Sequence, residues 1–320
     1  FALSAFMEIP DQYKDIKNLS LMKKSRISTV STASDIPYGG HIASRSMSEV
    51  ANDVFNASSA AKDDDSNAKC SANEDRFTSL DEVRAAIKAE GLESCRLIFG
   101  IDYTMSNTTQ GMNTFGGKNL HDLESLNPYQ EVICVLGEVL EPLNSDPDGT
   151  IPAFGFGGSI TQDKSIFKLK PEEGECCGFM GVLEAYEKIT PKIQLAGPSN
   201  FAPLIEKAVE IVIHSGNMYH ILVIVANGQV SNAEDTRKAI ENASDYPLSI
   251  IMIGVGDGPW DTMDEFDDLL PRRRFDNFQF VNFHEIMSTS KNPQAAFALS
   301  AFMEIPDQYK DIKNLSLMKK

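Results

Sequence analysis

The most regular feature of the chain is a set of continuous apolar runs in its last two thirds. Three of them lack the alternation of apolar and polar positions that a strand with one solvated face would show, at residues 96–102, 219–226 and 248–255. Strands of this kind are covered on both faces. Shorter apolar stretches predict three further strands, at residues 151–156, 165–169 and 278–281. We expect the strand at 165–169 to lie at an edge of the sheet.

Segments with a helical spacing of apolar residues separate these runs. Asn127 is a candidate N-cap with Pro128 in the first helical position. Ser231 and Glu234 form a capping-box pattern at the start of a later segment. Helices are therefore expected at residues 127–140, 178–189, 203–215 and 231–243. Because strands alternate with helices, we predict an α/β fold: a doubly wound, mostly parallel, Rossmann-like sheet with helices on both faces and one short antiparallel edge strand.

The two ends of the chain carry the same 24 residues. Residues 1–24 match residues 297–320 at every position, whereas structural repeats usually keep only their apolar pattern. Residues 25–74 are rich in serine and have no apolar period, which predicts a linker or disorder. A capping box at residue 79 predicts a first short helix over 79–89. We therefore divide the chain into the copied segment 1–24, the linker 25–74 and one folded domain over 75–320.

Because the segment occurs twice, two copies of it could compete for one binding groove on the domain. Residues 297–303 form an apolar helical stretch that we expect to end before Pro306. If this stretch docks in a groove of the domain, residues 1–24 fit the same groove. Either residues 1–24 are disordered and unused, or they dock in the groove of a second molecule, so that the segment is exchanged between molecules.

Charge, hydropathy and cysteine content limit the partners and the cellular environment that we expect for the chain. The formal net charge is −17, and the longest basic run is Arg272–Arg274, just after the acid-rich residues 261–268. Such a chain repels phosphate backbones, so we expect no nucleic-acid partner. No apolar run reaches about 18 residues, so we expect no direct membrane insertion. Five cysteines without a Cys-x2-Cys pair indicate a reducing, cytoplasmic environment.

Oxygen-bearing side chains gather where the predicted strands end. Asp102, Thr104 and Ser106 follow the first strand, Ser199 lies on a later loop, and Asn227 follows the strand at 219–226. Ligands of doubly wound sheets bind at these carboxyl ends. Hard oxygen donors without histidine or cysteine suit Mg2+ or Mn2+, or more loosely Ca2+, and do not suit zinc.

Several features have competing explanations. An Asp-x-Thr-x-Ser triplet is often only a turn with a side-chain cap. The glycines at 254–258 lack the full spacing of a dinucleotide-binding loop. The acids at 261–268 are best explained as a solvated face with Arg272–Arg274 as partners. A nucleotide-dependent enzyme remains an alternative supported by fold class alone.

Seven blocks of sequence resemble the copine-type von Willebrand factor A domain, and most of all the version found in plant-type RING ubiquitin ligases. They fall in family order between residues 91 and 310. They are GLESCRLIFGIDYTMSN, NPYQEVI, LAGPSNFAPLI, YHILVIVANGQV, LSIIMIGVGDGPWDTMDEFDD, FDNFQFVNFHEIM and FALSAFMEIPDQYK. The resemblance covers roughly the last 240 residues and nothing before about residue 75.

The resemblance implies a metal-ion-dependent adhesion site on a module that binds proteins and is not itself an enzyme. Asp102, Thr104 and Ser106 match the family pattern, and Ser199 stands where the family usually has threonine. Asn227 stands where the family usually has aspartate, which removes one charge and should weaken the binding of the ion. A carboxylate from a protein partner would complete the shell. The resemblance implies a scaffold linked to the calcium-dependent, phospholipid-binding signalling of copines. The alternative is the substrate-recognition part of a ubiquitin ligase whose RING lies outside this chain.

Overall fold

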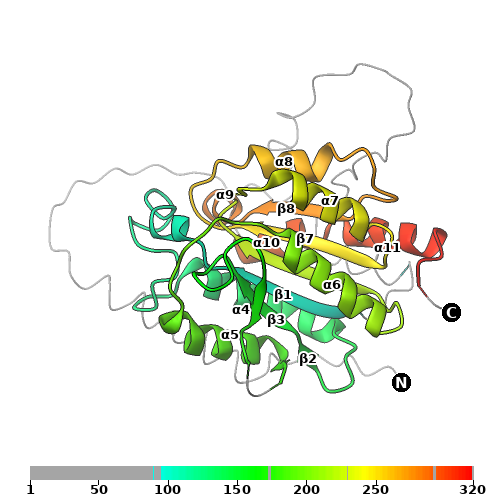
Figure 1. Ribbon diagram of the computed structural model, residues 1–320, viewed down its shortest axis with the longest axis horizontal. Helices are drawn as coiled ribbons and strands as arrows, with labels where there is room; N and C mark the ends of the chain where they lie inside the picture. Colours follow the sequence, from blue (N-terminus) through cyan, green and yellow to red (C-terminus); the bar gives the residue numbers. More distant parts are fainter. Residues whose placement is uncertain (1–88, 90–94, 172–173, 229, 291–292, 319–320) are drawn as a thin grey trace, which may run out of the picture. The chain divides into compact units, whose positions relative to one another are not determined.

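A six-stranded sheet forms the centre of the molecule in the computed structural model, which describes residues 89, 95–171, 174–228, 230–290 and 293–318 (Figure 1). The strand order is β4-β3-β1-β6-β7-β8. The strands are β1 Arg96–Asp102, β3 Ala153–Phe156, β4 Ile166–Lys168, β6 His220–Ala226, β7 Leu248–Gly254 and β8 Phe278–Asn282. All neighbouring strands are parallel except β3 and β4. The predicted mostly parallel sheet with one short antiparallel edge strand is confirmed.

The predicted strand over 151–156 is divided in two. Thr150–Ile151 forms β2, which pairs antiparallel with β5 Cys176–Cys177 in a separate small sheet. Only Ala153–Phe156 joins the main sheet, as β3 beside β1. Pro152 separates the two pieces and has no amide proton for a ladder hydrogen bond. Its carbonyl still accepts a hydrogen bond from Phe99 N at 2.9 Å.

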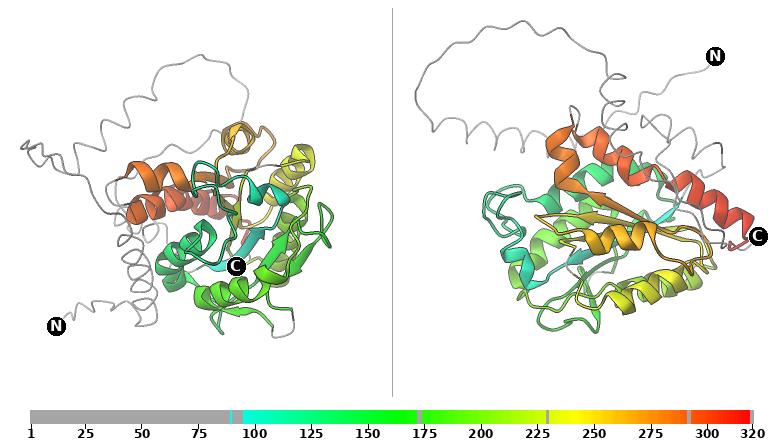
Figure 2. Two further views of the ribbon diagram at one scale, coloured as in Figure 1. Left: turned by 90° about the vertical axis from the view of Figure 1, so that its left-hand side faces the viewer. Right: turned by 90° about the horizontal axis from the view of Figure 1, so that it is seen from above.

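Helices cover both faces of the sheet (Figures 1 and 2). One apolar core joins strands to α6 Ala202–His214, α7 Ala233–Ala243 and α8 Asp261–Asp268. On the other face lie α4 Pro128–Leu140, α5 Gly178–Ile189 and α10 Pro293–Phe302, where Phe179 packs edge-on against Phe99 of β1. The remaining elements are α9 Phe283–Thr289, α11 Ile305–Asn314 and the 3-10 turns η1 Met105–Thr108, η2 Glu141–Leu143 and η3 Thr190–Lys192. No helix in the described ranges is long and apolar enough to cross a membrane.

The predicted N-cap residue is correct for α4 and wrong by one residue for α7. Asn127 caps α4, where it accepts a hydrogen bond from Gln130 N, and Pro128 begins the helix as predicted. The α7 helix begins one residue later than expected, because Asn232 is its cap and accepts from Asp235 N. The Ser231 hydroxyl instead accepts a hydrogen bond from the amide of Ser199.

The last two helices are part of the core. Phe297, Ala301 and Phe302 of α10 are buried, and Phe297 packs edge-on against Phe283. α10 ends at Phe302, and Pro306 lies in the first turn of α11. The matching residues 1–24, the predicted linker 25–74 and nearly all of the predicted helix over 79–89 lie outside the described residues.

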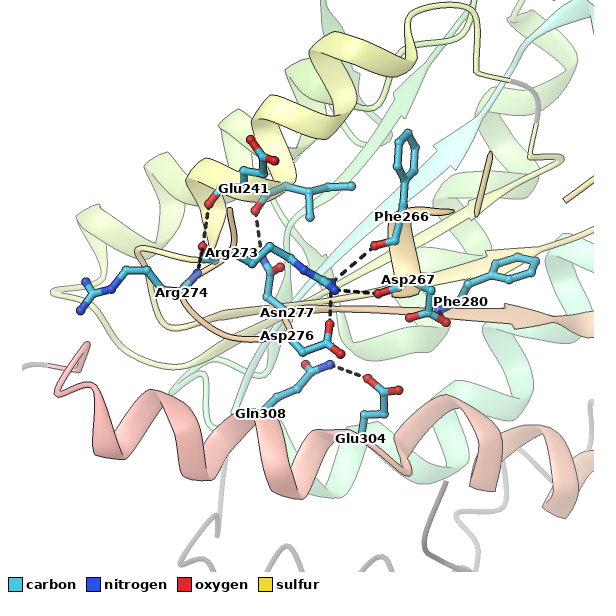
Figure 3. A network of polar contacts seen from close by, with 12 residues as sticks. Glu241, Phe266, Asp267, Arg273, Arg274, Asp276, Asn277, Phe280, Glu304 and Gln308 are labelled. Carbon is cyan, nitrogen blue, oxygen red and sulfur yellow. Dashed lines mark hydrogen bonds and ion pairs between the residues drawn. The ribbon is translucent and has the colours of Figure 1, made fainter. Parts of the chain in front are cut away.

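A buried ion pair at Arg273 corrects our expectation that Arg272–Arg274 are all partners of a solvated acidic face over 261–268, while Arg272 and Arg274 are exposed. Arg273 Nη1 lies 2.5 Å from Asp276 Oδ1, and both side chains are almost completely buried. Arg273 Nη2 also donates to the carbonyl of Asp267 at 2.7 Å. Figure 3 shows Gln308 of α11 and Glu304, the N-cap residue of that helix, on the side facing this pair. The arginine therefore ties the end of α8 to the start of β8.

Candidate metal site

The end of β1 places the Asp102 carboxylate in a tight hydrogen-bonded turn. Thr104 N donates to Asp102 Oδ1 at 2.8 Å, and Thr104 Oγ1 donates to Asp102 Oδ2 at 3.0 Å. Asp102 is fully buried, and Thr104 is nearly so. The alternation of residues along this turn puts both oxygen-bearing side chains on one side of the backbone. The two hydrogen bonds hold the carboxylate in one orientation.

Ser106 and Asn227 complete a cluster with Asp102 and Thr104. Thr104 Oγ1 and Ser106 Oγ are 2.9 Å apart, and Asn227 Nδ2 donates to Ser106 Oγ at 2.7 Å. Asn227 N also donates to Asp102 Oδ2 at 3.5 Å. Strands β1 and β6 are parallel neighbours, so their carboxyl ends meet at one edge of the sheet. Four of the five residues predicted from sequence thus form one hydrogen-bonded group.

The fifth predicted residue, Ser199, lies on the loop that runs beside this cluster. Thr104 and Ala196 form an isolated parallel bridge, which brings the loop to the metal face. Ser199 is 3% exposed, and its hydroxyl has no hydrogen-bond partner within the described part of the chain. A buried hydroxyl without a partner is costly, so an ion or its water would stabilise it.

Burial dominates the electrostatics of Asp102. It raises the pKa of the carboxyl to about 6, against the hydrogen bonds from Thr104 and Asn227, which lower it. No lysine or arginine forms an ion pair with Asp102 in the ranges that the structure describes. A buried carboxylate without a counter-charge gains more from a bound cation than an exposed one does.

The donor set fits a hydrated magnesium-type ion. It offers one carboxylate, three hydroxyls and one amide, and Mg2+ is usually held by one or two carboxylates with several waters. The described residues contain no cluster of three or more His, Cys, Asp or Glu side chains that could hold an ion by themselves. Asn227 presents its Nδ2 to Ser106 here, and a half turn of the amide would present Oδ1 at the same point. Asp102, Thr104, Ser106, Ser199 and Asn227 would hold the ion directly or through water.

Three buried residues behind the cluster were not predicted as site residues. Asn107 Nδ2, His121 Nε2 and Tyr129 Oη all lie within hydrogen-bonding distance of the carbonyl oxygen of Asp102. Asn107 follows the Asp-x-Thr-x-Ser pattern directly, so its position in sequence was a usable signal. His121 and Tyr129 come from a loop and from α4, and nothing in the sequence spacing connects them to Asp102.

Comparison with protein families settles the relationship of the chain. A family model described as Copine matches residues 119–320, which is more than half of the chain. The chain belongs to the copine family.

Some relatives of the chain are named as copine family proteins, and others as E3 ubiquitin-protein ligases. Copine family protein 2 of Caenorhabditis elegans is 52% identical over 248 residues, which cover 76% of this chain and 3% of that protein. A protein of Arabidopsis thaliana named E3 ubiquitin-protein ligase RGLG5 is 48% identical over 260 residues, or 76% of this chain and 60% of the relative. The copine chain described here therefore spans only part of the length of these relatives.

Solved structures with a similar fold share little sequence with this copine chain. Manganese-loaded TRAP protein of Plasmodium vivax is 12% identical with a TM-score of 0.40, covering 63% of this chain and 74% of that one. A von Willebrand factor type A protein from Catenulispora acidiphila is 13% identical with a TM-score of 0.39, covering 68% and 43%.

Proposed function

We propose that this copine domain is a metal-ion-dependent protein-binding module that acts as an interaction scaffold. The observation that carries the proposal is the hydrogen-bonded cluster of Asp102, Thr104, Ser106 and Asn227 at the carboxyl ends of β1 and β6. Mg2+, or Mn2+ or Ca2+, is the ion that its oxygen donors suit. The partner is a protein whose carboxylate completes the shell of the ion, and the domain itself catalyses no reaction.

Asn227 sets the strength of the site. A unit charge pair at about 4 Å is worth roughly 4 kcal/mol before desolvation at an effective dielectric constant near 20. The neutral amide forgoes this attraction, so the ion is held weakly by the free domain. An ion with one protein carboxylate also keeps more positive charge, which favours the partner's carboxylate. Partner and ion therefore bind cooperatively.

Calorimetric titration of metal-stripped protein with Mg2+, Mn2+ and Ca2+ tests the site. We expect Asn227→Asp to tighten binding by at least about tenfold, since net gains of roughly 1.4 kcal/mol suffice for that factor. We expect Asp102→Ala to bind no ion. Trp260 packs against Gly228 next to Asn227, so its fluorescence gives a second readout.

Asn242→Asp is the matched control, because it adds the same charge at an exposed position of α7. It should leave the affinity for the ion unchanged. Equal tightening in Asn242→Asp and Asn227→Asp would show that net charge, and not a local ligand, governs binding. Undiminished binding by Asp102→Ala would place the ion elsewhere and overturn the proposal.

A second function is favoured by the relatives that are named as ubiquitin ligases. In that case this domain recognises the substrate, and a RING outside this chain carries the ligase chemistry. Sequencing the full-length transcript separates the two functions. A Cys-x2-Cys array after residue 320 supports the ligase, and C2-like strands ahead of the domain support a copine of the calcium-dependent, phospholipid-binding kind.

The duplicated terminal segment supports one further part of the proposal. Residues 297–320 contribute the last six residues of α10 and all of α11 to the core, and residues 1–24 have the identical sequence. We propose that residues 1–24 of one molecule can replace α10 and α11 of another, which exchanges an identical element between copies. The net charge of −17 argues against nucleic acid as a partner, and we place the protein in the cytoplasm.

A further inference from the structure

The carbonyl oxygen of Asp102 is the focus of an unusual number of buried hydrogen bonds. His121 Nε2 lies 2.8 Å from it, Asn107 Nδ2 donates to it at 3.3 Å, and Tyr129 Oη lies 3.3 Å from it. All three side chains are buried. Because Asp102 is the residue from which the metal cluster is built, these contacts fix the backbone that carries its carboxylate.

The chemistry of His121 fixes the direction of these hydrogen bonds. A carbonyl oxygen can only accept, so Nε2 carries the ring proton and donates to Asp102. In a neutral ring Nδ1 is then an acceptor, so Tyr186 Oη donates to it at 2.8 Å. Tyr186 Oη in turn receives a hydrogen bond from Asn127 Nδ2 at 3.1 Å. A chain of donors runs from the N-cap of α4 through α5 to the end of β1.

Aromatic stacking holds the imidazole ring in its plane. His121 is stacked between Tyr103 and Tyr129, with ring centroids 4.8 Å and 4.2 Å away and interplanar angles of 10° and 16°. Tyr129 also donates to Asn107 Oδ1 at 2.7 Å, and Asn107 Nδ2 donates to the carbonyl of Thr104 at 3.0 Å. The same tyrosine thus supports both ends of the Asp102–Thr104 turn.

We propose that His121, Tyr129 and Tyr186 are positioning residues that couple the α4–α5 layer to the metal site through the backbone of Asp102. This proposal rests on the proposed function, since it concerns the same site. Asp102 and Thr104 keep their places only while α4 and α5 keep theirs. The affinity of the site for an ion is therefore set by helices that lie behind the sheet edge and do not touch the ion. Residues that orient a metal ligand from behind typically change affinity by about 10–100-fold.

Two tyrosines that bond within the relay supply the test, and a buried tyrosine outside it supplies the matched control. Tyr186→Phe removes the donor to His121, and Tyr129→Phe removes the donor to Asn107 and the hydroxyl beside the Asp102 carbonyl. Tyr219→Phe removes a buried hydroxyl that bonds to Ser249 Oγ at 2.8 Å, next to the start of β6 and away from the metal site at the end of that strand. All three changes delete one buried hydroxyl, so their general cost to stability should be similar.

We expect Tyr186→Phe and Tyr129→Phe to weaken Mg2+ or Mn2+ binding about tenfold in calorimetry, and Tyr219→Phe to change it less than about twofold. Amide hydrogen exchange of metal-free protein provides an independent readout. The Thr104 amide, which donates to Asp102 Oδ1, should exchange about tenfold faster in the first two variants only. Amides in the centre of β6 should be unaffected, which separates positioning from general loosening.

The two readouts distinguish failure of this inference from failure of the proposed function. If the native protein binds no ion but the Thr104 amide responds as expected, the relay holds and the metal function fails. If the native protein binds an ion, but all three variants match it in affinity and in Thr104 exchange, the relay is overturned. An equal loss in Tyr219→Phe would also overturn it, because the effect would then be a general loss of stability.

Discussion

Gly157 shows how one residue without a side chain shapes the metal site. Its φ is +79°, and a Cβ atom there would lie 2.4 Å from Thr104 Cγ2 and 3.2 Å from Asp102 Oδ1. The residue therefore lets the loop after β3 pass directly over the Asp102 turn. Any side chain at this position would displace the two residues that begin the cluster.

We expect Gly157→Ala to destabilise the protein by roughly 2–4 kcal/mol, from a strained backbone and steric overlap together. It should also abolish metal binding. Gly149→Ala is the matched control, since Gly149 has φ +66° but no neighbouring atom within 4 Å of the point where a Cβ would stand. That control should cost only about 1–2 kcal/mol and leave the ion bound. Chemical denaturation and calorimetry check both, and equal effects would mean that the loop over Asp102 is not close-packed.

At the scale of single residues, the sequence predicts the site residues that directly follow a strand. It does not predict the residues that contact the site from distant helices and loops. Asp102, Thr104 and Asn227 were predictable because the carboxyl ends of adjacent parallel strands meet at one edge. His121 and Tyr186 lie 19 and 84 residues from Asp102 in the sequence and meet its end of β1 only through the packing of α4, α5 and a loop. No local pattern marks such a contact.

Among the elements, the three long strands and the helices α4 to α7 were predictable to within two residues, whereas α8, α9 and α11 were not predicted and α10 begins four residues early. The strands at 96–102 and 248–255 are continuous apolar runs, the helix at 178–189 has an apolar face, and the structure has all three almost unchanged. The segment 151–156 was misjudged because its apolar content outweighed the missing amide proton of Pro152. Arg273 was misjudged because charge alone predicts exposure, and only the packing of α8 near the start of β8 creates a buried partner.

The contrast between two adjacent arginines tests the role of the buried pair. Arg273→Leu leaves the buried Asp276 without its arginine, which should cost about 3–5 kcal/mol. Arg274 pairs with Asp245 at 3.6 Å, and both side chains are about half exposed. Arg274→Leu should therefore change the free energy of unfolding by less than about 1 kcal/mol. Similar losses measured in urea for both variants would contradict the assignment of Arg273 as the link between α8 and β8.

For the molecule as a whole, alternation of strands and helices was enough to predict the sheet and its covering layers. The duplicated segment was visible in the sequence, but the burial of its C-terminal copy in the core was not. The structure shows that residues 297–302 lie in the core, so the copy at residues 1–24 has the composition of a buried element. Sequence identity alone could not distinguish a core helix pair from a surface tail.

Paired variants in the two copies test exchange between molecules. Ala301 is fully buried in α10, and Ala5 is its counterpart in the first copy. If residues 1–24 of another molecule can replace α10 and α11, Ala301→Asp should stay folded as a dimer or larger species, and the double variant with Ala5→Asp should unfold. Light scattering and circular dichroism measure both. Unfolding of Ala301→Asp alone, or a folded monomer of that variant, contradicts exchange.

The short strand β4 has a consequence for how copies of this molecule meet. An open sheet edge with free backbone groups is a template on which other chains can aggregate. Here that edge is three residues long and antiparallel, and its exposed Lys168 forms an ion pair with Glu175 at 2.6 Å. Short edge strands and lysines are features by which natural proteins resist fibre growth. At this edge, extension of the sheet into a neighbouring molecule is disfavoured even in a crowded solution.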